Sequence, residues 1–268
     1  MADGNAECQC LNKDTTPAFS AVLTHAQNVA ANTAVKFDKV VTNIQDGYDP
    51  ATGIFTAPTD GVYHISCTVT SPKGGKLFVS LYHNDVTISS MLVSPIDDTY
   101  EMGTTNMVLD LKGGDEVAIR SRGNFQAHNA ECQCLNRDTT PAFSAVPTHA
   151  QNVATNTAVK FDKVVTNIQD GYDPATGIFT APTDGVYHIS STVTSPKGGK
   201  LFVSMYHNDM KITSIWVSPA DATYEMGTTN MVLDLKKGDK VAIRSRGNFK
   251  VHSNADIYSS FSGFLISK

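Results

Sequence analysis

The chain has 268 residues, a formal net charge of −5 at pH 7 and 18% charged residues. It contains no basic tract of the kind that binds nucleic acid, and no apolar run long enough to span a membrane. The first four residues are not typical of a secretory signal, so we expect a mature secreted form or a cytoplasmic protein. The length favours two domains, each large enough to bury a core.

An internal repeat defines the domain organisation. Residues 6–125 align with residues 130–249 at a constant offset of 124, and about 14 of the 120 aligned positions differ. Segments this similar are expected to share one fold. We therefore expect an N-terminal extension at 1–16, a first domain at 17–126, a linker at 127–140 that could complete the first domain, and a second domain at 141–268.

Within one copy the predicted elements are short strands separated by turns. In chain order they cover residues 18–22, 35–43, 54–57, 62–70, 77–82, 88–93, 106–111 and 117–121. Alternation is clear at 62–70, where Tyr63, Ile65, Cys67 and Val69 share one face. No window has sustained helical periodicity. The pattern predicts an all-β sandwich in each copy.

A segment of 20 residues that recurs without change carries a family resemblance. Residues 47–66 and 171–190 combine turn chemistry with two short strands. The motifs fall in order as Ala18-Phe19-Ser20-Ala21, Val35-Lys36-Phe37, Asn43, Tyr48-Asp49, Thr52-Gly53-Ile54-Phe55, Ala57-Pro58, Gly61-Val62-Tyr63, Gly114-Asp115-Glu116-Val117 and Phe261-Ser262-Gly263-Phe264-Leu265. In two copies, nearly the whole chain resembles the globular-head domain of complement C1q. The resemblance implies two tandem ten-strand jelly rolls related to tumour necrosis factor.

The two copies differ at their ends, because only the second continues into a final strand, near residues 261–267. The first domain lacks such a segment of its own. We predict that residues 127–137 fill the empty position, since ten extended residues cover about 33 Å and can return the chain to the other end of the sandwich. Ala130, Cys132 and Cys134 would then face one side, with Glu131, Gln133 and Leu135 on the other.

The loops of an antiparallel jelly roll alternate between two ends. We call "base" the end with the chain start and the turns near residues 58–61, 83–87 and 112–116, and "apex" the opposite end, with the equivalent positions in copy 2. The predicted ligand-binding residues gather at the apex: Lys73, Lys76, Tyr100, Arg120, Arg122, Lys197, Lys200, Tyr224, Arg244 and Arg246. Two arginines two residues apart on a strand could bind a carboxylate or phosphate. Asp97, Asp98 and Asp221 could bind calcium. The alternative is that all these are solvated loop charges.

The five cysteines are Cys8, Cys10, Cys67, Cys132 and Cys134. Cys67 is serine in the second copy and lies on the apolar face of its strand, so we expect a buried free thiol. The two Cys-Gln-Cys segments could carry free thiols, bridge chains through disulfides, or share a zinc ion through four thiolates. Their spacing does not match an ordinary zinc motif.

The chain carries no recognisable catalytic motif: there is no nucleophile elbow, phosphate loop or zinc-protease signature. The histidines, among them His64, His83 and His128, are scattered singly and are expected to be structural. Trp216, the sole tryptophan, could stack on a sugar ring, but core or interface packing is the favoured interpretation. We therefore expect a binding protein and no enzyme.

The resemblance implies a secreted homotrimer that recognises carbohydrate or anionic microbial surfaces in innate immunity, with calcium as a possible cofactor. Alternatives are an extracellular matrix scaffold and a cytokine-like receptor ligand. We also expect the two bases to be neighbours and the two apices to point apart. The net charge of −5 in residues 6–125 and zero in 130–249 suggests that Lys211, Lys237 and Lys240 meet acidic residues of the first base, Asp85, Asp115 and Glu116.

Overall fold

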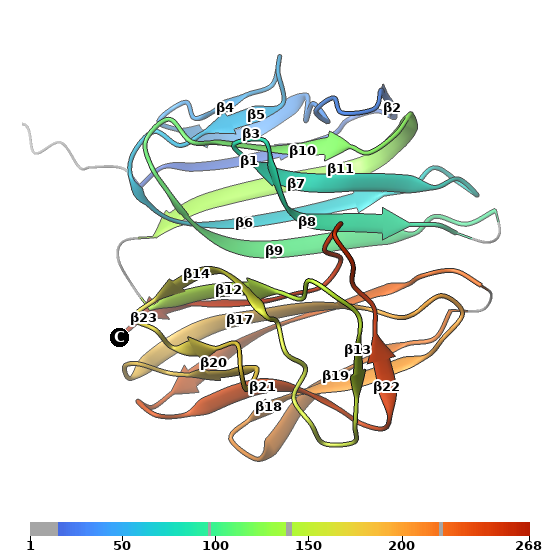
Figure 1. Cartoon of the computed structure of the whole chain (residues 1–268). Helices are drawn as coiled ribbons and strands as arrows, with labels where there is room; N and C mark the ends of the chain where they lie inside the picture. Colours follow the sequence, from blue (N-terminus) through green and yellow to red (C-terminus); the bar gives the residue numbers. More distant parts are fainter. Residues whose placement is uncertain (1–15, 96–97, 138–140, 220–221) are drawn as a thin grey trace, which may run out of the picture.

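The computed structural model describes residues 16–95, 98–137, 141–219 and 222–268, which form two all-β domains (Figure 1). The strands of domain 1 are β1 (Ala18–Val22), β2 (Gln27–Val29), β3 (Lys39–Ile44), β4 (Tyr48–Asp49), β5 (Ile54–Thr56), β6 (Gly61–Thr70), β7 (Leu77–His83), β8 (Val86–Val93), β9 (Met102–Leu111), β10 (Glu116–Ser121) and β11 (Phe125–Arg137). They form one sheet in the order β3-β1-β11-β6-β9 and a second in the order β4-β5-β10-β7-β8. This is the predicted jelly-roll sandwich.

Domain 2 repeats this arrangement. Its strands are β12 (Ala142–Val146), β13 (Gln151–Val153), β14 (Lys163–Ile168), β15 (Tyr172–Asp173), β16 (Ile178–Thr180), β17 (Gly185–Thr194), β18 (Leu201–His207), β19 (Met210–Val217), β20 (Met226–Leu235), β21 (Lys240–Ser245), β22 (Phe249–Val251) and β23 (Ser260–Ser267). The two main sheets have the orders β14-β12-β23-β17-β20 and β15-β16-β21-β18-β19, and β13 pairs with β22. The described residues contain no helix long and apolar enough to cross a membrane.

Strand β11 completes domain 1, which confirms the prediction for residues 127–137. It lies between β1 and β6, with Cys134 opposite Phe19 on one side and Ile65 on the other. Ala130, Cys132 and Cys134 are buried, whereas Glu131 and Gln133 are exposed. The connection to domain 2 thus removes an open backbone edge inside the sheet.

An aromatic stack fills the base half of each core. In domain 1, Phe19 stacks on Tyr48 at 4.8 Å and on Phe55 at 5.0 Å between ring centres. The Tyr48 hydroxyl accepts a hydrogen bond from the backbone N–H of Phe37 and donates one to its carbonyl. Burial raises the pKa of Tyr48 to about 12, so this phenol stays protonated. Residues 143, 161, 172 and 179 repeat the arrangement.

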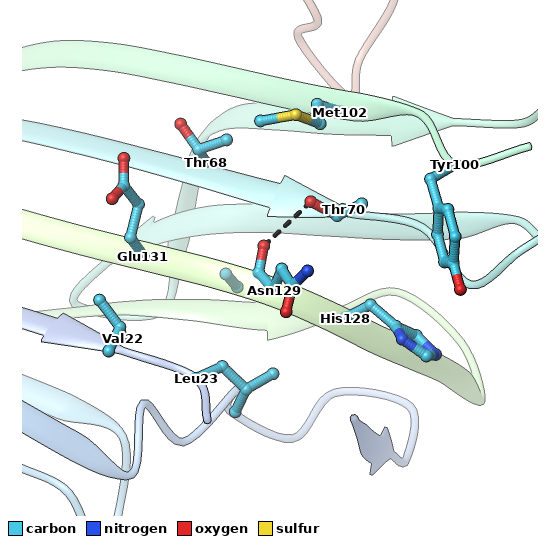
Figure 2. Close-up of a pocket in the computed structure, with 10 residues that line it drawn as sticks. Val22, Leu23, Thr68, Thr70, Tyr100, Met102, His128, Asn129 and Glu131 are labelled. Atoms are coloured by element: carbon cyan, nitrogen blue, oxygen red, sulfur yellow. Dashed lines mark hydrogen bonds between the residues drawn. The ribbon is translucent and has the colours of Figure 1, made fainter. Parts of the chain in front are cut away.

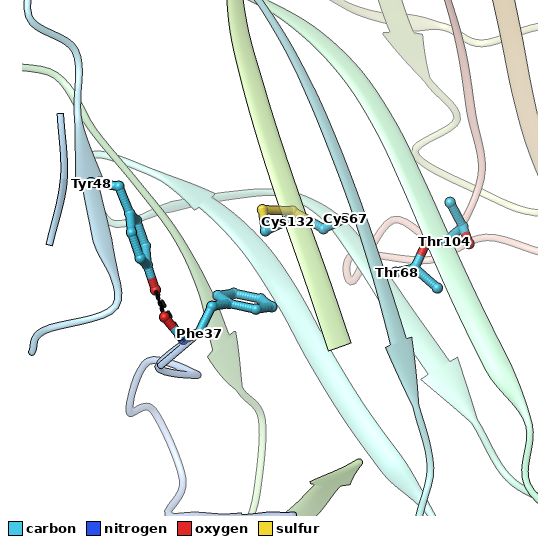
Figure 3. Close-up of a disulfide and its surroundings, with 6 residues drawn as sticks. All are labelled: Phe37, Tyr48, Cys67, Thr68, Thr104 and Cys132. Carbon is cyan, nitrogen blue, oxygen red and sulfur yellow. Dashed lines mark hydrogen bonds between the residues drawn. A yellow bond between two sulfur atoms is a disulfide. The ribbon is translucent and has the colours of Figure 1, made fainter. Parts of the chain in front are cut away.

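In domain 1 a disulfide joins Cys67 of β6 to Cys132 of the neighbouring strand β11 (Figure 3). The expectation of a free thiol at Cys67 is therefore wrong. The register of β6 against β11 sets these two residues directly opposite each other, with their Cα atoms 4.2 Å apart. Cys134 remains a buried free thiol. At the equivalent positions of domain 2, Phe261 lies opposite Ser191, and its ring contacts Phe143 at 4.8 Å. Cys8 and Cys10 lie outside the described residues.

The two domains lie side by side, with β9 of domain 1 across the outer face of β12, β14, β17 and β23 (Figure 1). Ser262 donates a hydrogen bond to the carbonyl of Asn106, and Thr192 to that of Thr104. Closer to the bases, Val108 joins Phe264 in a small apolar cluster. The domains therefore run in the same direction.

The expectation that the two apices point apart is wrong. Burial, and then the charge of Glu101, raise the pKa of Glu225; these two residues belong to the apex loops of domains 1 and 2. The side-by-side arrangement is compatible with neighbouring bases. In this arrangement domain 2 covers the outer side of β9. No ion pair joins a domain 2 lysine to a domain 1 acid in the described part of the chain, so the predicted pairing with Asp85, Asp115 and Glu116 is also wrong.

Candidate functional groove

A groove of about 560 Å³ opens at the apex of domain 1, along the first half of β11 (Figure 2). Val22, Leu23 and Ala130 contribute apolar surface, and Thr68 and Thr70 contribute hydroxyl groups. The remaining lining residues are Tyr100, Met102, His128, Asn129 and Glu131. The groove therefore combines an apolar wall with hydrogen-bonding groups of several kinds, as ligand sites do.

The groove exists because β11 bulges where it passes Thr70. The pairing with β6 shifts between His128 and Glu131, and Asn129 adopts a left-handed backbone with φ of 27°. Asparagine tolerates that region better than most residues. The Thr70 hydroxyl donates a hydrogen bond of 2.9 Å to the Asn129 carbonyl, which holds the bulge in place.

In domain 2 the position equivalent to the groove is occupied by the longer segment that precedes the final strand. Seven residues, 253–259, separate His252 from the start of β23, where domain 1 has two between His128 and Glu131. His252 lies between Tyr224 and Tyr258, with ring centres at 4.4 and 5.5 Å. Burial lowers the pKa of His252, so burial favours its neutral form. In domain 1 the corresponding pair, Tyr100 and His128, is 5.9 Å apart.

The chemistry of the groove suits a ligand with several hydroxyl groups. Tyr100 is 56% exposed and offers a ring face beside the His128 imidazole. Glu131 can accept hydrogen bonds, and Asn129 can both donate and accept. No lysine or arginine is among the residues that line the groove. Its electrostatics therefore favour a neutral ligand over an anionic one.

Of the predicted binding residues, Tyr100 is the one in this groove. Lys73 forms an ion pair with Asp98 at 3.0 Å, and both side chains are exposed. Lys76, Lys197 and Lys200 are exposed at the apex. Tyr224 is half-buried against His252. The lysines frame the apex end of the molecule without converging on the groove.

The four predicted arginines pack on aromatic rings of their own domains. Arg120 lies over Tyr82 and pairs with Asp85 at 2.5 Å, which places its guanidinium towards the base and not at the apex. Arg244 repeats this arrangement with Asp209 at 3.2 Å. Arg122 lies over Phe78 and Arg246 over Phe202, at 5.7 and 6.0 Å from the ring centres. The two arginines of each domain contact the same tyrosine, Tyr82 in domain 1 and Tyr206 in domain 2, but their guanidinium groups do not converge on one open site.

The proposed calcium ligands lie mostly beyond what the structure describes. Asp97 and Asp221 are outside the described residues, and Asp98 is paired with Lys73. Within the described ranges, no group of three or more histidine, cysteine or acidic side chains comes together.

Apart from Tyr100, the residues that line the groove were not identified as binding residues from the sequence, and His128, Asn129 and Glu131 are the most polar of them. The available signal was the short segment between His128 and Glu131, where copy 1 lacks five residues that copy 2 has between His252 and its last strand. Trp216 does not enter the core, which was one of its two expected positions: it is 55% exposed and lies edge-on to Phe202 at 5.0 Å.

Each domain is a sandwich of two main antiparallel sheets, with six and five strands in domain 1 and five in each sheet of domain 2, so the chain is a tandem jelly-roll protein. A family model described as the C1q domain matches residues 18–134 and 142–266, and the chain belongs to this family.

Two solved structures match about half of the chain each. The globular domain of zebrafish complement 1qA is 25% identical, with a TM-score of 0.42, over 48% of this chain and 98% of that chain. An Eiger tumour necrosis factor from S. frugiperda is 12% identical, with a TM-score of 0.42, over 48% of this chain and 94% of that chain.

Proposed function

We propose that this protein is a non-enzymatic, lectin-like recognition protein whose domain 1 groove binds a neutral sugar of a microbial surface glycan. The observation that carries the proposal is the groove itself, with the exposed Tyr100 ring beside hydroxyl, amide and carboxylate groups. A sugar ring offers an apolar face to an aromatic side chain and hydroxyl groups to acceptors such as Glu131. Pattern recognition in innate immunity is the corresponding role.

The groove favours a neutral sugar over the acidic ligands suggested by the apex arginines. Glu131 repels a second carboxylate, and no cationic lysine or arginine lines the groove to offset that repulsion. Calcium binding by Asp97, Asp98 and Asp221 remains a separate proposal. Binding measured in calcium and again in a chelator separates the two.

Glycan-array binding of the full chain is the test, followed by affinity measurements on the sugars that bind. Tyr100→Ala and Glu131→Gln should each weaken binding about tenfold or more, because each removes one side of the groove. Tyr224→Ala is the matched control, since the same position in domain 2 is packed against His252. An array without any bound glycan, or equal affinities for all three variants, would contradict the proposal and favour a scaffold role.

We also propose that the protein is secreted and forms homotrimers. The disulfide of domain 1 supports an oxidising compartment. Tyr63, Tyr82 and Phe78 are aromatic residues on the strands of domain 1 that could pack between chains in a trimer, but they are mostly used within the chain: Tyr63 and Tyr82 are buried, and Phe78 contacts Tyr258 at 5.8 Å. The trimer therefore stays a prediction of family membership, and light scattering of the full chain tests it.

A further inference from the structure

Domain 2 inserts a short segment into domain 1, and the surface that receives it exists a second time. The segment is Asn254-Ala255-Asp256-Ile257-Tyr258, which lies between β22 and β23 and rises towards β8 of domain 1 (Figure 1). We call it the docking segment. Asp256 forms an ion pair with Arg122 at 2.8 Å, and the Tyr258 ring lies 5.8 Å from Phe78.

The backbone of the docking segment takes part as well. The N–H of Ser90, on edge strand β8, donates a hydrogen bond of 2.7 Å to the carbonyl of Ile257. Ile257 is 5% exposed and belongs to the apolar core cluster of domain 1. It has a φ of 59°, which is rare for a β-branched residue and is kept only where surrounding contacts hold it. The contact is therefore built from a carboxylate, an apolar side chain with its carbonyl, and an aromatic ring.

The receiving surface of domain 1 has a counterpart in domain 2. At the offset of 124 residues, Arg246, Phe202, Tyr206 and Ser214 replace Arg122, Phe78, Tyr82 and Ser90, and Trp216 replaces Leu92. Both arginines donate a hydrogen bond of 2.7 Å to the tyrosine hydroxyl beneath them. Ser214 lies opposite Ser204 as Ser90 lies opposite Ser80, so the local frame is the same. We call the domain 2 surface the open docking surface.

The two surfaces differ in whether they are covered. Ser90 is fully buried, whereas Ser214 is exposed. No acidic side chain of the described chain pairs with Arg246, although Asp256 pairs with Arg122. Trp216 is 55% exposed at the position where domain 1 has a smaller leucine. The open docking surface therefore presents a guanidinium, an aromatic pair and the edge of strand β19 to solvent.

We propose that the open docking surface of domain 2 binds a segment of another polypeptide with the chemistry of the docking segment: an acidic residue, an aliphatic residue and an aromatic residue in succession. The acid would pair with Arg246, the aliphatic residue's carbonyl would accept from Ser214, and the aromatic ring would pack on Phe202 and Trp216. A second copy of this chain is not the occupant, because its own docking segment is held by its own domain 1.

Trp216 makes the proposal directly measurable, because it is the sole tryptophan of the chain and lies in the surface. The first probe is isolated domain 2, residues 141–268, which carries Trp216→Leu. The tryptophan fluorescence of the mixture then comes from Trp216 of the full chain alone. The core cluster of this domain contains only its own residues, from Phe143 to Leu265, and its strands pair only with one another, which indicates that it folds alone. Circular dichroism and a cooperative thermal transition verify the probe.

Binding should shift the Trp216 emission to shorter wavelength in a saturable manner, since the indole leaves water. Arg246→Ala in the full chain, or Asp256→Asn in the probe, should weaken the affinity about tenfold or more. Lys250→Ala in the full chain is the matched control, because it removes an exposed cation of the same domain outside the surface.

A cyclised peptide of residues 252–259 is the second probe and does not depend on a folded domain. Its binding, with the same dependence on Arg246, would support the proposal. Unchanged Trp216 emission with both probes at high micromolar concentration would overturn it. Binding that survives both Arg246→Ala and Asp256→Asn would also overturn it, because contact would then come from another part of domain 2, such as strand β20.

Discussion

Strands β9 and β20 have the same sequence, Met-Gly-Thr-Thr-Asn-Met-Val-Leu-Asp-Leu, and opposite surroundings. Val108 of β9 is 1% exposed because domain 2 covers it, whereas Val232 of β20 is 59% exposed. The same ten residues therefore form an interface in one domain and a solvated edge strand in the other. Burial of identical residues here depends on the neighbour that each strand meets and not on its own pattern.

The difference arises on the outer face of the sheet to which β9 or β20 belongs, at the final strand of that sheet. The outer face of domain 2 carries Ser260, Ser262 and Phe264, all buried against domain 1. The equivalent face of domain 1 carries the residues of β11, with Glu131 in place of Ser260 and Gln133 in place of Ser262. A buried carboxylate without a partner is costly, so this face is a poor receptor for another β9-type strand. The final strand thus determines which domain can receive the other.

The largest expected effect tests the difference in burial between β9 and β20, which have the same sequence. Val108→Asp should destabilise the protein by about 3 kcal/mol or more, because it places an unpaired carboxylate in the cluster with Val62 and Phe264. Val232→Asp should change stability by about 0.5 kcal/mol or less. Thermal and denaturant unfolding measure both. Equal shifts for the two variants would show that the domains do not pack in this way in solution.

The second effect concerns the difference between the final strands β11 and β23, of which only β11 carries a disulfide. Cys67→Ser combined with Cys132→Ser should destabilise domain 1 by about 2–4 kcal/mol, since the covalent link between β6 and β11 is lost. Domain 2 has Ser191 and Phe261 at these positions and should be unaffected. Hydrogen exchange resolved by peptide reports each domain separately. Increased exchange confined to β23 would contradict this assignment.

The smallest effect should be alike in the two domains. A hydrogen bond from the backbone N–H of Lys112, followed by one from the side-chain amide of Asn84, lowers the pKa of Asp115 to about 2. A side-chain bond from Asn208, followed by the backbone of Lys236, lowers that of Asp239 to about 2. Each folded-state pKa lies below the unfolded value of about 3.9. The stability that the two ionised carboxylates contribute is therefore complete above about pH 4. It is lost as the pH falls from about 4 to about 2.

Denaturant unfolding across this pH range checks the acid dependence. Asp115→Asn and Asp239→Asn should each remove part of the acid-induced loss of stability, and by similar amounts, because the two turns have the same hydrogen-bonding partners. A pH dependence that neither variant reduces would contradict the role of these carboxylates.

Much of the fold could be predicted because it depends on local patterns. Alternation along residues 62–70 identified β6, and Tyr63, Ile65, Cys67 and Val69 are all buried as the pattern indicates. The position of β11 followed from chain geometry, since the chain had to return from the apex to the base. The disulfide was missed because it depends on the register of β11 against β6, which sets Cys67 opposite Cys132 and not opposite Cys134.

The candidate sites were harder to predict than the fold. Tyr100 was identified from its place in an apex loop, but His128, Asn129 and Glu131 join it only because β11 bulges and no loop covers them. Arg120 and Arg122 were predicted to point together into the apex, but the Arg120 guanidinium pairs with Asp85 towards the base. Their partners, such as Asp256 for Arg122, come from 134 residues away in the chain and could not be read from spacing.

The sequence by itself determined that the chain holds two copies of one β-sandwich, because alternation, turn residues and a constant offset are properties of neighbouring residues. The tertiary structure was needed to show that β9 is buried and β20 is not, and that Asp256 pairs with Arg122 and not with Arg246. It was also needed to show the open groove at the apex of domain 1. The physical reason is that these features depend on contacts between residues distant in sequence. Identical segments have identical local preferences, so their different surroundings follow from the final strands, which pack on different partners.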